Sequence, residues 1–139
     1  MFLGEYSHTI DAKGRLFIPA KFREELGERF FVTRSVDACL AVYSEEQWQR
    51  FTDKLNALPE IQSRKIRRFL FSAATGVEPD GQGRILIPQV LRDYAKMDKA
   101  VSVLGVGDHI EIWSSEALQS ELTNEDVSEI EQTLIGLGF

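Results

Sequence analysis

The chain has 139 residues, 43% of them hydrophobic, and a formal net charge of −6. This apolar content, with nine Phe, is typical of a folded protein and excludes a disordered chain. No apolar run approaches the ~20 residues that a transmembrane helix needs, and residues 1–10 show no signal-peptide pattern. The single Cys, Cys39, cannot form an intrachain disulfide, and we expect it to be a buried thiol in a reducing cytosol.

The charge is unevenly distributed along the chain. Residues 1–70 hold twelve Lys and Arg against ten Asp and Glu, whereas residues 71–139 hold four against twelve. Residues 114–139 contain six acidic residues and no basic one. Because surface charges act within ~8–10 Å at physiological salt, a basic face can coexist with an acidic tail. The net negative charge therefore does not exclude a nucleic-acid partner.

One thirteen-residue phrase occurs twice, at residues 11–23 and 80–92. Such a repeat at half the chain length indicates an internal duplication. A unit of ~70 residues buries only ~60% of its unfolded surface and is marginal alone, so we expect the two copies to share one core. Six positions are identical between the copies: Asp11 and Asp80, Gly14 and Gly83, Arg15 and Arg84, Ile18 and Ile87, Pro19 and Pro88, and Arg23 and Arg92.

The first copy predicts strands and two helices. Gly14 suits the left-handed position of a hairpin turn, and Pro19 and Gly27 suit the first turn and the end of a short helix. Ser44 begins a capping box, which marks the start of a longer helix. In chain order we predict a strand at 4–11, a turn at 11–14, a strand at 15–18, a helix at 19–27, strands at 30–33 and 39–43, and a helix from 44 to about 58.

The second copy repeats this order after a linking helix. We predict a helix at about 61–75, strands at 77–80 and 84–87 around the second turn, a helix at 88–96, strands at 100–106 and 110–113, a helix capped by Ser114, and an amphipathic helix within 124–135. The predicted fold class is α+β. Its predicted parts are a first unit at 1–58, a linking helix at 59–76, a second unit at 77–122 and an acidic C-terminal helix or tail at 123–139.

The repeated turn has the pattern Asp-x-x-Gly-Arg. Its spacing lets the carboxylate of Asp11 accept from backbone N–H groups and pair with Arg15, which would hold the turn rigid and direct the guanidinium outward. A single copy is explained by a surface ion pair worth under ~1 kcal/mol. Two copies, each followed by Ile-Pro and a helix, favour a reader of phosphates or groove edges.

The two turns carry unequal charge, because Gln82 occupies the position of Lys13. We therefore expect Lys13 and Arg15 to contribute more affinity than Arg84. Lys21 and Arg23 add positive charge near the first turn, although a solvated helix face explains them equally well. The predicted DNA contacts are Lys13, Arg15, Arg84, Lys21 and Arg23, and the residues predicted to orient the turns are Asp11, Gly14, Asp80 and Gly83.

The densest basic run is residues 64–68, where Arg64, Arg67 and Arg68 share one helix face. Two interpretations remain open for it. The run is either a stripe that contacts DNA or a surface that meets acidic groups of a neighbouring subunit, and the second is slightly favoured because the C-terminal half is acidic.

No pattern indicates catalysis. The sequence has no G-x-S-x-G elbow, and His8 and His109 lie at non-equivalent places in the two copies. Neither lies at a metal-ligand spacing with Cys39. We therefore predict no enzymatic activity, no metal or other cofactor and no small-molecule substrate. We interpret the large aromatic residues as core or subunit-interface residues: Phe17, Trp48, Phe51, Phe69, Phe71 and Trp113.

The duplicated turns resemble the Asp-x-x-x-Arg signature of the MraZ family. Residues 2–19 resemble this family closely, and residues 80–88 also fit it. The resemblance covers essentially the whole chain, and only the last ~15 residues are generic. Position by position, Asp11 and Arg15 match the first signature, and Asp80 and Arg84 match the second.

This resemblance implies two AbrB-like (SpoVT-AbrB, swapped-hairpin or double-split barrel) units that form one pseudo-two-fold module with peripheral helices. It also implies a transcriptional regulator that assembles into homo-oligomeric rings. Such a regulator would bind short direct repeats in double-stranded promoter DNA of the division and cell-wall operon, including its own gene, on the nucleoid in the cytoplasm. The alternative is an oligomeric protein–protein interaction scaffold that uses the same turns.

Overall fold

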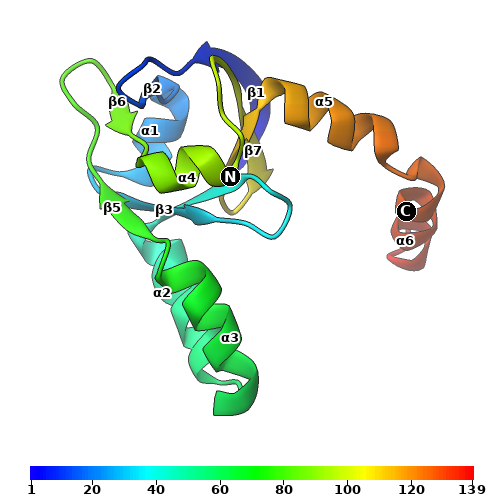
Figure 1. The fold of residues 1–139 in the computed structure, drawn as a ribbon. Helices are drawn as coiled ribbons and strands as arrows, with labels where there is room; N and C mark the ends of the chain where they lie inside the picture. The colour runs from blue at the N-terminus through cyan, green and yellow to red at the C-terminus, as the bar shows by residue number, and fades with distance from the viewer.

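The computed structural model describes all of residues 1–139 and shows an α+β protein with two antiparallel sheets (Figure 1). The strands are β1 (Phe2–Thr9), β2 (Arg15–Phe17), β3 (Phe30–Arg34), β4 (Leu40–Ser44), β5 (Thr75–Val77), β6 (Arg84–Leu86), β7 (Ala100–Gly107) and β8 (Ile110–Ser114). The helices are α1 (Ala20–Leu26), α2 (Glu45–Asn56), α3 (Glu60–Phe71), α4 (Gln89–Tyr94), α5 (Ser115–Asn124) and α6 (Val127–Gly136). No helix has the length and apolar content needed to cross a bilayer.

The larger sheet is symmetric about its centre. Its six strands run in the order β1-β7-β8-β4-β3-β5. Exchanging the counterparts from the two copies, β1 with β5, β3 with β7 and β4 with β8, only reverses this order. Ala41 of β4 lies opposite Glu111 of β8, and Leu16 of β2 lies opposite Ile85 of β6. Each of these pairs joins equivalent residues, so a pseudo-two-fold axis passes through both.

The strands flanking each repeated turn do not pair with each other, so the predicted hairpins are wrong. Strand β1 pairs with β7 and β2 pairs with β6, so both strands that flank the first turn form hydrogen bonds with the second copy. Strand β5 in turn pairs with β3. A lone copy of ~70 residues would be marginally stable, and this exchange places both copies around a single core.

That shared core confirms the expectation that the copies fold together. It is one cluster of 19 buried residues drawn from both halves. Leu16 and Ile85 lie at its centre, with 0% and 1% of their surfaces exposed. Phe22 of α1 and Leu91 of α4, which are counterparts, are buried in the same cluster.

Two helical extensions leave the sheet in different directions (Figure 1). Helices α2 and α3 project together, and α5 and α6 form a second arm. The predicted cap of α2 is confirmed, because the Ser44 hydroxyl accepts from the backbone N–H of Gln47 at 3.2 Å.

Helix α3 ends earlier than predicted, at Phe71, and residues 75–77 form strand β5. Side chains of β3 bind the last turn of this helix and hold it against the sheet. The Thr33 hydroxyl donates to the carbonyl of Leu70 at 2.5 Å, and the Arg34 Nε donates to that of Phe69 at 2.7 Å.

Candidate nucleic-acid interface

The first turn is closed by the carboxylate of Asp11. Its Oδ1 accepts from the backbone N–H of Lys13 at 3.0 Å and of Arg15 at 2.9 Å. Its Oδ2 accepts from the Nε of Arg15 at 2.6 Å. These are the hydrogen bonds that the four-residue spacing predicts. They fix one edge of the guanidinium group and leave its two terminal nitrogens without a recorded protein partner.

The second turn repeats this geometry. Asp80 Oδ1 accepts from the N–H of Gln82 at 2.9 Å and of Arg84 at 3.0 Å, and its Oδ2 accepts from Arg84 Nε at 2.9 Å. In both turns the backbone N–H of the arginine is the main cause that lowers the pKa of the aspartate carboxyl. Both carboxylates therefore stay ionised at neutral pH and well below it.

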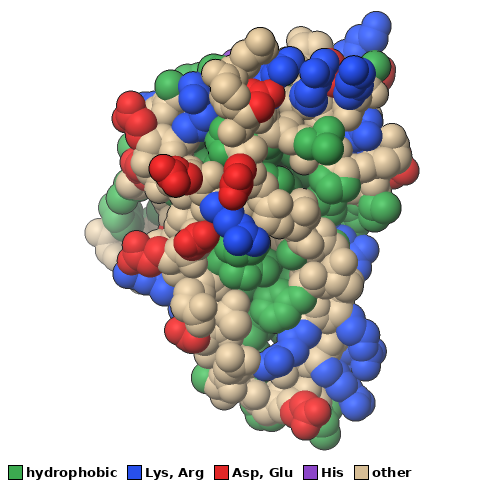
Figure 2. Space-filling model, turned by 90° about the vertical axis from the view of Figure 1, so that its left-hand side faces the viewer, with side chains coloured by type: hydrophobic (Ala, Val, Ile, Leu, Met, Phe, Trp, Pro, Cys, Tyr) green, Lys and Arg blue, Asp and Glu red, His purple; other side chains and the backbone are tan.

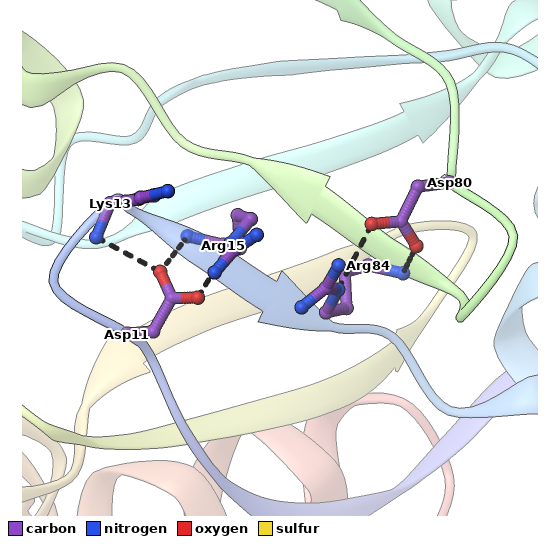
Figure 3. Close-up of polar contacts among 5 residues, drawn as sticks. All are labelled: Asp11, Lys13, Arg15, Asp80 and Arg84. Atoms are coloured by element: carbon purple, nitrogen blue, oxygen red, sulfur yellow. Dashed lines mark hydrogen bonds and ion pairs between the residues drawn. The ribbon is translucent and has the colours of Figure 1, made fainter.

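The two turns lie at opposite ends of one two-stranded ribbon, formed by β2 and β6 (Figure 3). Side chains alternate between the faces of a strand. Because Leu16 and Ile85 point into the core, Arg15 and Arg84 point to the outer face. The structure thus displays two aligned arginines on a single surface.

Each turn is also held by the opposite copy. At the first turn, the backbone N–H of Ile87 donates to the carbonyl of Gly14 at 2.8 Å. The Arg92 side chain donates its Nε to the carbonyl of Ile87 at 2.9 Å and packs on Gly14, where a Cβ would lie 2.8 Å from its guanidinium carbon.

At the second turn, Arg23 has the same role. Its Nε donates to the carbonyl of Ile18 at 2.8 Å, and a Cβ on Gly83 would lie 2.7 Å from its guanidinium carbon. The N–H of Ile18 donates to the carbonyl of Gly83 at 3.0 Å. Arg23 and Arg92 therefore join the copies across the ribbon. Sequence reasoning missed this role, although the identity of both arginines in the repeat was a signal for it.

The other predicted contacts are dispersed around the first turn. Lys13 lies exposed in the turn itself, and Lys21 lies exposed on α1. Arg23 is half-buried, with its guanidinium 5.2 Å from the centre of the Phe17 ring. The ribbon thus brings Lys13, Arg15 and Arg84 together, while Arg23 is already engaged by protein groups.

On the face in Figure 2, Lys and Arg side chains gather at the upper end and along the helical extension at the lower end, with others between them among acidic side chains. Helix α3 belongs to this extension and carries four exposed cations: Arg64, Lys65, Arg67 and Arg68. None of these four forms an ion pair within the chain.

Residues for other chemistries are not assembled. No group of three or more His, Cys, Asp or Glu is placed to hold a metal ion. Cys39 is fully buried, as predicted, and this burial raises the pKa of its thiol to about 12. The protonated, inaccessible thiol cannot act as a nucleophile at neutral pH.

Fold and site together define a class: a duplicated, strand-exchanged α+β protein that displays an Asp–Arg turn at each end of one ribbon. A family profile described as "MraZ protein, putative antitoxin-like" matches this chain twice, over residues 1–69 and 70–137. The chain belongs to the MraZ family.

Its relatives agree with this assignment. Proteins named "Transcriptional regulator MraZ" from Carboxydothermus hydrogenoformans, Thermoanaerobacter sp. and Desulfitobacterium hafniense are 53%, 51% and 48% identical to this chain. The alignments cover 84%, 92% and 100% of this chain and 82%, 91% and 100% of the relatives.

Proposed function

We propose that this chain is a sequence-specific DNA-binding transcriptional regulator. Acting as a homo-oligomeric ring, it binds short direct repeats in the promoter of the division and cell-wall operon, including its own gene, on the nucleoid in the cytoplasm. The observation that carries the proposal is the pair of aligned arginines, Arg15 and Arg84, on the outer face of one ribbon. The names of the relatives as transcriptional regulators support it.

The ribbon suits the major groove of DNA, which admits a two-stranded β-ribbon. The terminal nitrogens of Arg15 and Arg84 are the donors that recognise guanine edges or phosphates in such a groove. Their partners Asp11 and Asp80 orient them and do not themselves contact phosphate. Because the side chains are held in place before binding, less conformational freedom is lost on contact.

Affinity at a single repeat should be modest. The two Asp–Arg pairs are neutral overall, so the ribbon adds little net charge beyond Lys13. A ring that engages several repeats gains by effective concentration, which can raise affinity by ~10²–10⁴-fold when the spacing fits.

A second candidate is a protein-binding scaffold that uses the same face. Leu86 lies on the outer face of the ribbon opposite Arg15 and is 57% exposed, an apolar contact that a protein partner could bury. The family description includes the words "antitoxin-like". Binding of DNA from upstream of the gene separates the two candidates.

The test measures affinity for that DNA across salt concentrations, and the two unequal turns supply matched variants. We expect Lys13→Gln to weaken binding and to reduce the salt slope by ~1, because one phosphate contact is lost. We expect Gln82→Lys to do the reverse. Arg15→Ala should cost ~1–3 kcal/mol if the arginine reads a base.

The control is Lys99→Gln, which removes one exposed cation between α4 and β7 and should change little. An Arg15→Ala variant with unchanged affinity and salt slope would show that the contact assignment is wrong. Absence of binding to any promoter fragment at low salt would refute the regulator proposal itself.

A further inference from the structure

The two helical extensions are counterparts with opposite charge. Helices α2 and α5 each follow an equivalent capping serine, Ser44 and Ser114. Residues 45–71, which include α2 and α3, carry six Lys and Arg against four Asp and Glu. Residues 114–139, which include α5 and α6, carry six acidic residues and no basic one. The pseudo-two-fold relation thus pairs a basic extension with an acidic one.

The acidic arm has an apolar face with no partner in its own chain. Every residue from 121 to 139 is exposed. The spacing of three, four and three residues places Val127, Ile130, Leu134 and Leu137 along one side of α6, where they are 69%, 46%, 45% and 71% exposed. Glu129 and Glu131 on the same helix form no ion pair.

The basic extension presents a complementary surface. On α3, Ile61, Arg64, Lys65 and Arg68 share one face by their spacing, and Ile61 is 75% exposed. The Arg67 side chain instead donates to Asn56 of α2. The aliphatic stems of the three remaining cations extend the apolar surface next to Ile61, while their charged ends stay available.

From this complementarity we propose that the α6 arm of one copy docks on the α3 face of a second copy of this chain. The interface buries the Val127–Leu137 face against Ile61 and the Arg and Lys stems, and it pairs Glu129 and Glu131 with the α3 cations. The arm and the α2–α3 extension leave the sheet in different directions, so the partner is another copy and not the arm's own chain (Figure 1).

This contact joins two different surfaces, so it is head-to-tail. Repeated head-to-tail contacts close into a ring when the rotation between neighbours allows it. The inference therefore deepens the ring part of the proposed function and names the surfaces that form it. It also assigns the 64–68 run to subunit contact and not to DNA.

Two full-length variants test the contact in the absence of DNA, by light scattering on a sizing column. Both alter residues that are exposed in the chain, so folding should be retained, which circular dichroism checks. We expect Ile130→Asp with Leu134→Asp, and separately Arg64→Glu with Arg68→Glu, to lose the high-mass species. Adding Glu129→Lys and Glu131→Lys to the Arg64/Arg68 variant should restore it. The control Lys96→Glu with Lys99→Glu, which reverses two other exposed cations, should keep the wild-type mass.

A wild-type chain that is monomeric, or variants that keep the wild-type mass, would overturn the docking proposal. So would an Arg64/Arg68 reversal that lowers DNA affinity at unchanged mass, because the run would then be a DNA contact. These outcomes are independent of the regulator proposal, which stands or falls with DNA binding by the wild-type protein.

Discussion

Gly14 and Gly83 each combine a left-handed backbone with a close neighbour. Their φ angles are 87° and 79°, a region that side chains other than Gly rarely adopt. An added Cβ on Gly14 would also lie 2.7 Å from the carbonyl oxygen of Ile87. The residue in each turn is therefore limited by both conformation and space.

We expect Gly14→Ala to lower the free energy of unfolding by about 1–3 kcal/mol or more, because the left-handed strain adds to the contact with Ile87. The matched control is Gly81→Ala in the second turn, where a Cβ would meet no atom within 4 Å. That variant should change stability by less than about 0.5 kcal/mol. Urea denaturation measures both, and equal stabilities for the two variants would contradict this account of the turn.

At this scale the sequence predicted the turns well, because their chemistry is local. The bonds of Asp11 and Asp80 follow from a spacing of four residues. It did not reveal that Arg23 and Arg92 brace the opposite turns, since that contact depends on the strand exchange. Comparison of the copies offers a rule: both bracing arginines are retained, whereas Lys21 has Val90 as its counterpart. Residues kept in both copies build the turns and the ribbon, Arg15 and Arg84 included, and those that differ are free to specialise.

Strand pairing shows why the fold was harder to predict than its elements. Alternating apolar residues indicate that a segment forms a strand, but they do not predict which other strand it pairs with. Strand β1 pairs with β7, which places Phe2 opposite Gly107 and joins the beginning of the chain to its second half. That choice depends on the core as a whole, because residues of both copies form one cluster and a single copy would be marginal alone.

Arg23 and Arg92, which hold the turns of the opposite copy, should both contribute to the stability of the fold. Arg23→Ala and Arg92→Ala should lower the free energy of unfolding by similar amounts, about 1–3 kcal/mol, because each removes one Nε bond to a carbonyl of its own copy and the packing of the guanidinium on the glycine of the opposite turn. Thermal or urea unfolding measures the loss. Arg92 is not among the predicted DNA contacts, so it serves as the structural control for Arg23.

The same pair of variants also separates structure from binding. If Arg23→Ala and Arg92→Ala change the salt slope of DNA binding equally, the Arg23 side chain acts only as a brace. A lower slope for Arg23→Ala alone would show that Arg23 also contacts phosphate.

The proposed ring would make demands on its DNA that a single protomer would not. Ribbons fixed in such a ring would contact successive repeats only when those repeats face the same side of the duplex. We therefore expect affinity to fall by most of the ~10²–10⁴-fold avidity gain when about five base pairs are inserted between two repeats, because half a helical turn moves one to the far side.

Binding to fragments that differ only in this spacing provides the measurement. Inserting about ten base pairs restores the phase and serves as the control. If affinity is unchanged by the half-turn insertion, the ribbons do not engage the repeats simultaneously from a fixed assembly.

The axis that relates Leu16 to Ile85 is a property of the backbone and not of the surface. A dimer of identical chains cannot distinguish the two directions along a duplex, and it matches palindromes. Here both halves belong to one covalent chain, so Lys13 and Gln82 can differ at equivalent positions. The two ends of the ribbon therefore differ: the end with Lys13 carries one more positive charge than the end with Gln82. If the ribbon reads DNA as we propose, the sites that suit it all point the same way, as direct repeats do and inverted repeats do not.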